Sequence, residues 1–226
     1  PLVKNEINKS KVFIPIAQLV YSTNTSSPID PIDEDSSTTE FDSSTLFKLR
    51  KIPGIDRQEK GLRLNAGLKY FYDYKNNYKY SVSLGQVYRN KNSKDFLQSS
   101  GLNGYESDIL LTGNISFQRD LEIASKQVYS KNFSLKRSDT SLKLTKTRYQ
   151  INTSLVNLIS DPSEGTSADL KELTLNINSS LTKNWSGNIG LRRNMVNNEN
   201  INASVGFNFS NECIDIDLSL SRRNTA

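Results

Sequence analysis

The residue types that most often carry out catalysis are scarce in this chain. It has no histidine and one cysteine, Cys213. Such a chain cannot build the usual zinc site or a Ser-His or Cys-His nucleophile pair. We therefore expect no catalytic residues, no metal site and no cofactor. The remaining polar candidates are lysines, arginines and carboxylates, and the basic ones can pair with phosphate.

The basic residues outnumber the acidic ones, 29 to 24, which gives a formal net charge of +5. An excess of this kind can indicate a nucleic acid or an anionic lipid as partner. Here the basic residues alternate with apolar ones instead of forming one basic run, which favours solvated faces of strands. We expect no nucleic-acid partner.

One hairpin, residues 61–89, sets the pattern for the rest of the chain. Apolar residues occupy every second position of its first arm: Leu62, Leu64, Ala66, Leu68, Tyr70 and Tyr72. The second arm repeats the alternation with Tyr78, Tyr80, Val82, Leu84 and Tyr88. Side chains on a strand alternate between faces, so the hairpin has one apolar and one polar face. Asn76-Asn77 suits the tight turn between the arms.

The length of these strands indicates a membrane. Each arm spans roughly ten residues or more, as a tilted transmembrane strand requires, whereas strands of globular proteins average about 5–6 residues. Only 35% of the residues are hydrophobic, which would also fit disorder, but the repeated alternation argues for strands. A sheet with one lipid-facing and one wet face has this composition. No apolar run is long enough for a membrane helix.

The alternation predicts about eleven strands of an all-β, antiparallel up-and-down transmembrane β-barrel. They are residues 11–22, the two arms of 61–89, 107–118, two less regular strands within 121–147, and 149–160, 170–182, 185–194, 201–210 and 213–223. Loops at 23–60, 90–106, 132–139, 160–169 and 197–200 would lie at one end of the barrel, and turns near 76, 120, 147, 184 and 211 at the other. The aromatic residues fall near the short turns, which fits a girdle at the periplasmic rim; aromatic residues also favour strands in general.

The polar face of the strands would line the barrel lumen. Its charged members are Arg63, Lys69, Lys79, Arg89, Lys143, Glu172, Arg192, Asp215 and Asp217. They could contact lipid phosphates or sugar hydroxyls, or simply hydrate the interior and pack against a plug protein. The strands also hold Gly67, Gly85, Gly113 and Gly190, which usually mark a bend or a close approach.

Several segments resemble the C-terminal barrel of LptD, the lipopolysaccharide-assembly protein of the outer membrane. They are IAQLVYS, the block around 40–89, FSLKRSD at 133–139 and NECIDIDLSLSRR at 211–223. The most specific block joins F-D-x-x-x-L-F, G-x-D-R and S-x-G-Q-x-Y-R. Its loop positions are Phe41, Asp42, Leu46, Phe47, Gly54, Asp56 and Arg57.

The resemblance implies a large barrel that holds an LptE-type lipoprotein as a plug. This barrel receives lipopolysaccharide from a periplasmic LptA-type bridge and releases it into the lipid of the outer leaflet. Cys213 occupies the place of a cysteine that, in the family, pairs with the periplasmic N-terminal domain; the alternative is an inert thiol. The chain would then be a fragment that lacks this domain, the first half of the barrel and the final strand. Its two unpaired edges would not tolerate lipid, so we expect that it cannot insert alone.

Two questions stay open at this stage. Asp56 and Arg57 either order an extracellular plug around the emerging lipid or form a solvated turn. The whole chain could instead belong to a passive porin, which predicts an inward-folded constriction loop, or to a secreted adhesin or solenoid, which would show a fixed repeat period. No such period is found.

Overall fold

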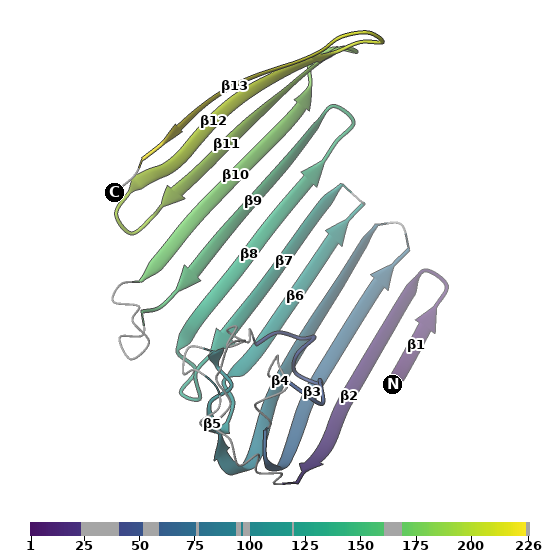
Figure 1. The fold of residues 1–226 in the computed structure, drawn as a ribbon. Coiled ribbons are helices and arrows are strands. Elements are labelled where there is room, and N and C mark those ends of the chain that lie inside the picture. The colour runs from purple at the N-terminus through teal and green to yellow at the C-terminus, as the bar shows by residue number, and fades with distance from the viewer. Residues whose placement is uncertain are drawn as a thin grey trace.

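The computed structural model describes residues 1–23, 41–51, 59–75, 77–93, 96, 100–118, 120–160 and 169–224. These residues form one antiparallel, up-and-down sheet of 13 strands (Figure 1), which confirms the predicted all-β class. The order is β1-β2-β3-β4-β6-β7-β8-β9-β10-β11-β12-β13, and β5 pairs with β4 at its end. The sheet is not closed, because β1 and β13 are not neighbours. No helix in the described ranges has the length and apolar character that a membrane crossing requires.

The strands are long and follow one another in sequence order. Their bounds are β1 Leu2–Glu6, β2 Lys9–Ser22, β3 Gly61–Tyr74, β4 Tyr78–Ser93, β5 Gly104–Glu106, β6 Ile109–Phe117, β7 Leu121–Tyr129, β8 Leu135–Thr145, β9 Tyr149–Leu158, β10 Leu170–Ser180, β11 Trp185–Asn194, β12 Glu199–Ser210 and β13 Asp215–Arg223. Tight turns join the strands at one end and longer connections at the other, as Figure 1 shows.

Two differences from the expected strand map have simple reasons. The structure has two strands beyond the eleven expected, because β1 and β5 carry no alternation to detect: β1 is exposed throughout and β5 has three residues. The loop expected at 132–139 is shorter, since β8 begins at Leu135 and a tight turn closes before it through a 2.8 Å bond from Ser130 N to Ser134 O. The polar residues that follow Leu135 interrupt the apolar alternation, so the sequence did not predict the beginning of this strand.

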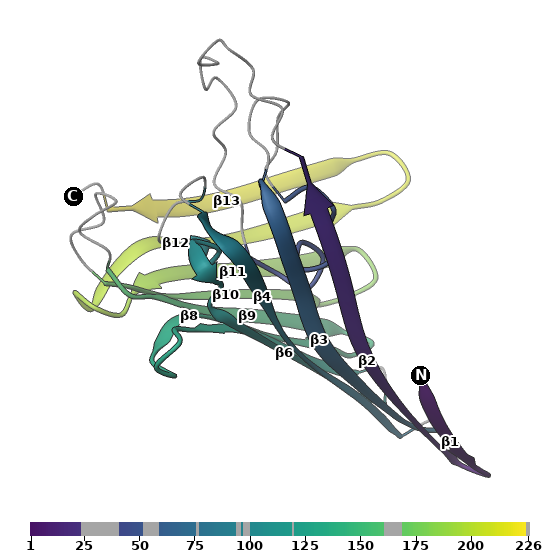
Figure 2. The ribbon, with the colours of Figure 1, turned by 90° about the horizontal axis from the view of Figure 1, so that it is seen from below.

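The cross-strand register separates two faces along the whole sheet. We call the face that carries Gly67, Gly85 and Val87 the inner face, and Figure 2 shows how strongly the sheet curves. On the outer face, Leu64, Leu68 and Leu84 are each at least a third exposed within this chain. An apolar face of this kind, continued through Val205, Phe207 and Leu218 at the far end of the sheet, fits contact with lipid.

The buried core does not lie between two layers of the sheet. It lies on the inner face at the long-loop end, where segment 41–51, Phe96 and residues 100–108 pack against β3, β4, β6 and β7. Its fully or nearly fully buried apolar members are Phe41, Leu46, Val87, Phe96, Leu102, Leu110 and Val128, with Phe47 packed against them. We call segment 41–51 together with Glu59 the plug segment.

Candidate functional site: a plugged end and an open polar face

The first turn of the plug segment is built by Asp42. Its carboxylate oxygen Oδ1 accepts hydrogen bonds from the backbone N–H groups of Ser44 and Thr45, each at 2.7 Å. The Thr45 hydroxyl accepts one from Asp42 N at 2.9 Å, and Leu46 N donates to Asp42 O at 3.0 Å. This is the reciprocal pattern of a capped helical turn. Partial burial raises the pKa of Asp42, but the bonds from Ser44 and Thr45 outweigh it and lower the pKa below its ordinary value.

The capped turn directs Leu46 and Phe47 onto two facing glycines. Gly67 of β3 and Gly85 of β4 are directly paired across the ladder. A Cβ added at Gly85 would lie 2.1 Å from Leu46 Cδ2, and one added at Gly67 would lie 2.8 Å from Phe47 Cζ. The two glycines therefore form a notch that only a residue without a side chain can provide at this separation. Gly113, by contrast, has no atom within 4 Å of such a Cβ, so there is no close approach at this position.

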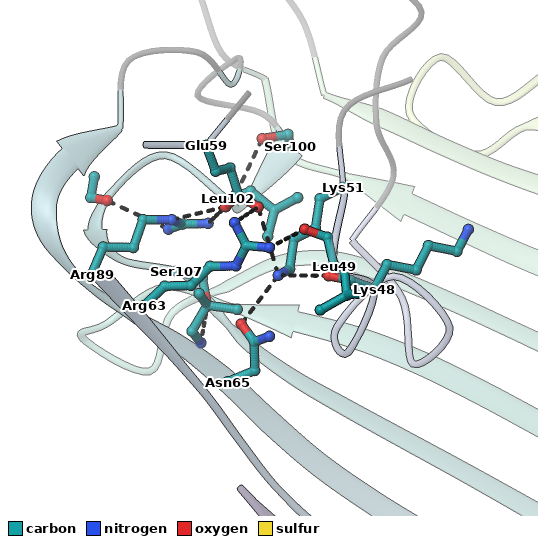
Figure 3. A network of polar contacts seen from close by, with 12 residues as sticks. Lys48, Leu49, Lys51, Glu59, Arg63, Asn65, Arg89, Ser100, Leu102 and Ser107 are labelled. Carbon is teal, nitrogen blue, oxygen red and sulfur yellow. Dashed lines mark hydrogen bonds and ion pairs between the residues drawn. The ribbon is translucent and has the colours of Figure 1, made fainter. Parts of the chain in front are cut away.

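A buried ionic cluster fastens the plug segment to the sheet (Figure 3). The carboxylate of Glu59 accepts hydrogen bonds from Arg89 Nε at 3.0 Å and from Arg89 Nη2 at 2.8 Å. Its other oxygen, Oε2, lies 3.0 Å from Arg63 Nη1 and 3.7 Å from Lys51 Nζ. These two contacts are ion pairs without hydrogen-bond geometry. Each of the four side chains is at most 5% exposed.

Further polar contacts join the cluster to neighbouring strands and to the loop. Lys51 Nζ donates to Asn65 Oδ1 at 3.1 Å, and Asn65 Nδ2 donates to Gln18 Oε1 of β2 at 2.7 Å. The Arg63 guanidinium also donates to the carbonyl oxygen of Leu49. Burial lowers the pKa of Lys51 to about 8, although the attraction of Glu59 opposes this shift. Three cations thus share one carboxylate within the described residues.

The inner face of β9–β13 is different, because no described loop covers it. Arg192 forms a two-pronged contact with Glu172, through Nε at 2.6 Å and Nη2 at 2.9 Å, and the arginine side chain is 55% exposed. Asn208 Nδ2 donates to Asp215 Oδ1 at 2.9 Å and to Asp217 Oδ1 at 2.7 Å. These polar groups face open space on this side of the sheet.

The register places all nine charged candidates from the sequence on the inner face. Arg63 pairs across the ladder with Arg89, Lys69 with Ser83 and Asp73 with Lys79. Lys143 of β8 pairs with Glu122 of β7 and with Asn152 of β9, which places it on the same face. The structure does not leave them equally accessible: Arg63 and Arg89 lie under the plug segment, while Glu172, Arg192, Asp215 and Asp217 are in the open part.

The described residues include only part of the family-motif loop. Phe41, Asp42, Leu46 and Phe47 lie in the plug segment, whereas Gly54, Asp56 and Arg57 lie outside the described residues. The sequence did not single out Lys51 or Glu59, because neither sits on a periodic strand. The signals that pointed to this site were the family-motif positions in the loop, the charges of Arg63 and Arg89, and two glycines, Gly67 and Gly85, on the polar face of adjacent strands.

The short-turn end gathers aromatic side chains and Cys213. Tyr72 stacks on Tyr78 with ring centroids 5.6 Å apart, and Trp185 meets Phe209 at 5.0 Å. Cys213 is exposed and has a free thiol; its backbone N–H donates to Asn211 Oδ1 at 2.9 Å within the β12–β13 turn. The described residues bring no three His, Cys, Asp or Glu side chains together as a metal site would require.

Comparison with known families identifies this architecture. Residues 4–185 match the family described as LptD, LPS transport system D. The chain belongs to the LptD family. A search of curated proteins gave no match. The family assignment associates the chain with lipopolysaccharide transport and assembly of the outer membrane.

Proposed function

We propose that this chain forms part of the wall of the outer-membrane translocon that inserts lipopolysaccharide into the outer leaflet. The observation that carries the proposal is the family match over residues 4–185, to which the two-faced sheet adds a physical means. An apolar outer face suits contact with outer-membrane lipid, and a wet inner face suits passage of a sugar-rich headgroup.

The two parts of the inner face have separate roles in this proposal. The plug segment closes the lumen at the long-loop end while no substrate passes, since its apolar and ionic contacts hold it against the wall. The open polar face of β9–β13 offers Arg192, Asp215 and Asp217 to phosphates and sugar hydroxyls. Gly54, Asp56 and Arg57 lie between Lys51 and Glu59 in the sequence, and we assign them to the closure as well.

The partners follow from the same proposal. An LptE-type lipoprotein would pack inside the lumen, against the inner face that no described loop covers. A periplasmic LptA-type bridge would deliver lipopolysaccharide through a preceding domain. Cys213, exposed in a turn at the short-turn end, would form a disulfide with that domain, because the periplasm is an oxidising compartment.

We also propose that residues 1–226 are the C-terminal portion of a larger barrel in the outer membrane of a Gram-negative cell. Strands β1 and β13 each have one edge without a partner in the described sheet. Unpaired edges are not tolerated in lipid, so further strands must complete the wall. The isolated segment should therefore fail to give a folded, heat-resistant, membrane-inserted species.

A passive porin is the second candidate, and one observation favours it. Segment 41–51 folds inward against the wall, as the constriction loop of a porin does. The two functions differ in what the loop must do: a constriction loop stays in place during passage, whereas a closure has to move. A porin would also need no lipoprotein partner.

Depletion of the full-length protein in the cell separates the two candidates. For the translocon we expect lipopolysaccharide to disappear from the cell surface and accumulate at the inner membrane, and a small lipoprotein to co-purify with the barrel. Unchanged surface lipopolysaccharide, together with slower uptake of small solutes, would contradict the translocon and support the porin.

A further inference from the structure

A polar cavity lies at the long-loop end, between the end of β4, the residues around β5 and the β7–β8 turn. Its volume is about 460 Å³, within the roughly 300–1,000 Å³ of small-molecule sites. The side chains that face it with polar groups are Asn92, Asn103, Asp108, Lys131, Asn132 and Lys136. The cavity adjoins the ionic cluster around Glu59, because Arg89 Nη1 donates at 3.4 Å to the carbonyl oxygen of Gly104, which lines the cavity.

The walls of this cavity are preformed. Asp108 N donates to Gly101 O at 2.7 Å, and Gly101 has a positive φ of 73°, a conformation that favours glycine. A Cβ at Gly101 would lie 3.3 Å from Asp108 Oδ2. On the opposite side, the hydroxyls of Ser130 and Ser134 lie 2.6 Å apart across the β7–β8 turn. Tight turns on both sides therefore hold the lining residues in place without a ligand.

The charges in the cavity are incompletely matched. Asp108 is 6% exposed and forms an ion pair with Lys136, whose Nζ lies 2.8 Å from Asp108 Oδ2. Lys131 is exposed and forms no ion pair with any described residue, while the 3.9 Å between its Nζ and the Cβ position of Gly104 places the ammonium at the cavity wall. Two ammonium groups, those of Lys131 and Lys136, thus line the cavity against the one carboxylate of Asp108, so the charged groups of the described lining sum to +1.

We propose that this cavity binds a phosphorylated sugar of the lipopolysaccharide that the barrel transports, an inference that rests on the function proposed above. The Lys131 ammonium pairs with the phosphate, and the amides of Asn103 and Asn132 bond to hydroxyls of the sugar. A sugar supplies both donors and acceptors, which this mixed lining requires, and the phosphate supplies the missing negative charge. The position at the long-loop end places the site where the headgroup leaves the barrel.

The test uses the full-length protein with its lipoprotein partner in detergent micelles. The probes are acyl-free lipopolysaccharide core oligosaccharide with its phosphates, the same oligosaccharide after dephosphorylation, and inorganic phosphate. Lys131→Gln should weaken binding of the phosphorylated oligosaccharide about tenfold, because a hydrogen bond to a charged group is lost. It should leave the dephosphorylated probe unchanged. Lys183→Gln, at an exposed lysine in a short turn at the opposite end, is the matched control and should change neither.

A second variant separates sugar recognition from charge. Asn132→Ala, at an exposed turn position, should weaken binding of both oligosaccharides about threefold, since it removes one neutral hydrogen bond. Equal affinities of the Lys131→Gln and Lys183→Gln proteins would overturn the site. Inorganic phosphate binding as tightly as the oligosaccharide would overturn its assignment to a sugar. Neither result contradicts the proposed transport function. That proposal is contradicted only if depletion of the full-length protein leaves surface lipopolysaccharide unchanged.

Discussion

The plugged end of the sheet and its open part use the same strand pattern to different effect. In β3 and β4, the inner-face guanidinium groups of Arg63 and Arg89 are buried and share the carboxylate of Glu59. In β10–β13, by contrast, Arg192 is 55% exposed and pairs with Glu172, and the exposed Asp215 and Asp217 accept hydrogen bonds from Asn208. Burial makes the first set depend on one another, because a buried charge without a partner is far more costly than an exposed one. The comparison shows that burial under the plug segment, and not residue type, determines how strongly an inner-face charge depends on its ion-pair partner.

The largest effect should come from the shared carboxylate. Glu59→Gln leaves Lys51, Arg63 and Arg89 buried with no negative charge among the described residues. Removing one partner of a buried ion pair costs about 3–5 kcal/mol, so segment 41–51 should come away from the wall. Amide hydrogen exchange in the full-length protein would show it as loss of protection at Leu46 and Lys48. Unchanged protection at both amides would mean that apolar packing alone holds the segment.

The glycine notch should give the next largest effect. Gly85→Val puts a branched side chain where Leu46 now lies, and overpacking of this kind costs about 1–3 kcal/mol. Gly113→Val is the matched control, since a Cβ there meets nothing within 4 Å and valine suits a strand. We expect exchange of the Leu46 amide to accelerate in the first variant alone. Equal acceleration in both would indicate a general effect of valine on the sheet.

The stability of the plug segment against the sheet should depend moderately on pH, which distinguishes the plugged end from the open part of the inner face. Because burial lowers the pKa of Lys51 to about 8 from 10.5, the seated plug segment binds fewer protons than the released one in that range. The seated state should therefore gain stability as the pH rises from about 8 toward 10.5. Hydrogen exchange of residues 41–51, corrected for the intrinsic rate, measures this change. Lys51→Met should remove the dependence; a variant that keeps it would assign the titration to another group.

The smallest effect belongs to the open face. Glu172→Gln breaks the two-pronged contact with Arg192, whose side chain is 55% exposed. Exposed pairs contribute about 0–1 kcal/mol, so thermal unfolding of the full-length barrel, purified without its lipoprotein partner, should hardly change. A loss comparable to that of Glu59→Gln would show that another part of the full-length chain buries this face.

Most strands could be predicted from the sequence, because a sheet with one apolar and one polar face gives its long strands alternating apolar and polar residues; β1 and β5 lack this alternation. The plug segment could not, since Phe41, Leu46 and Phe47 sit in a loop whose polar flanks give no period. Resemblance to a family indicated that these residues matter, without indicating what they touch. Only their packing against Gly67 and Gly85 supplies the reason. Lys51 and Glu59 could not be predicted for the same reason. Residues that pair across segments far apart in the sequence follow no regular spacing that a sequence pattern could reveal.

Glu59 also has a consequence for how the plug segment can move. Its carboxylate holds Arg63 of β3, Arg89 of β4 and Lys51 of the loop at once. If Glu59 withdraws, all three cations lose their counterion together. A partly released plug segment therefore has no ion pair left in this cluster that would stabilise it. Opening should therefore be cooperative, with two populated arrangements and few intermediates, instead of a gradual fraying from one end.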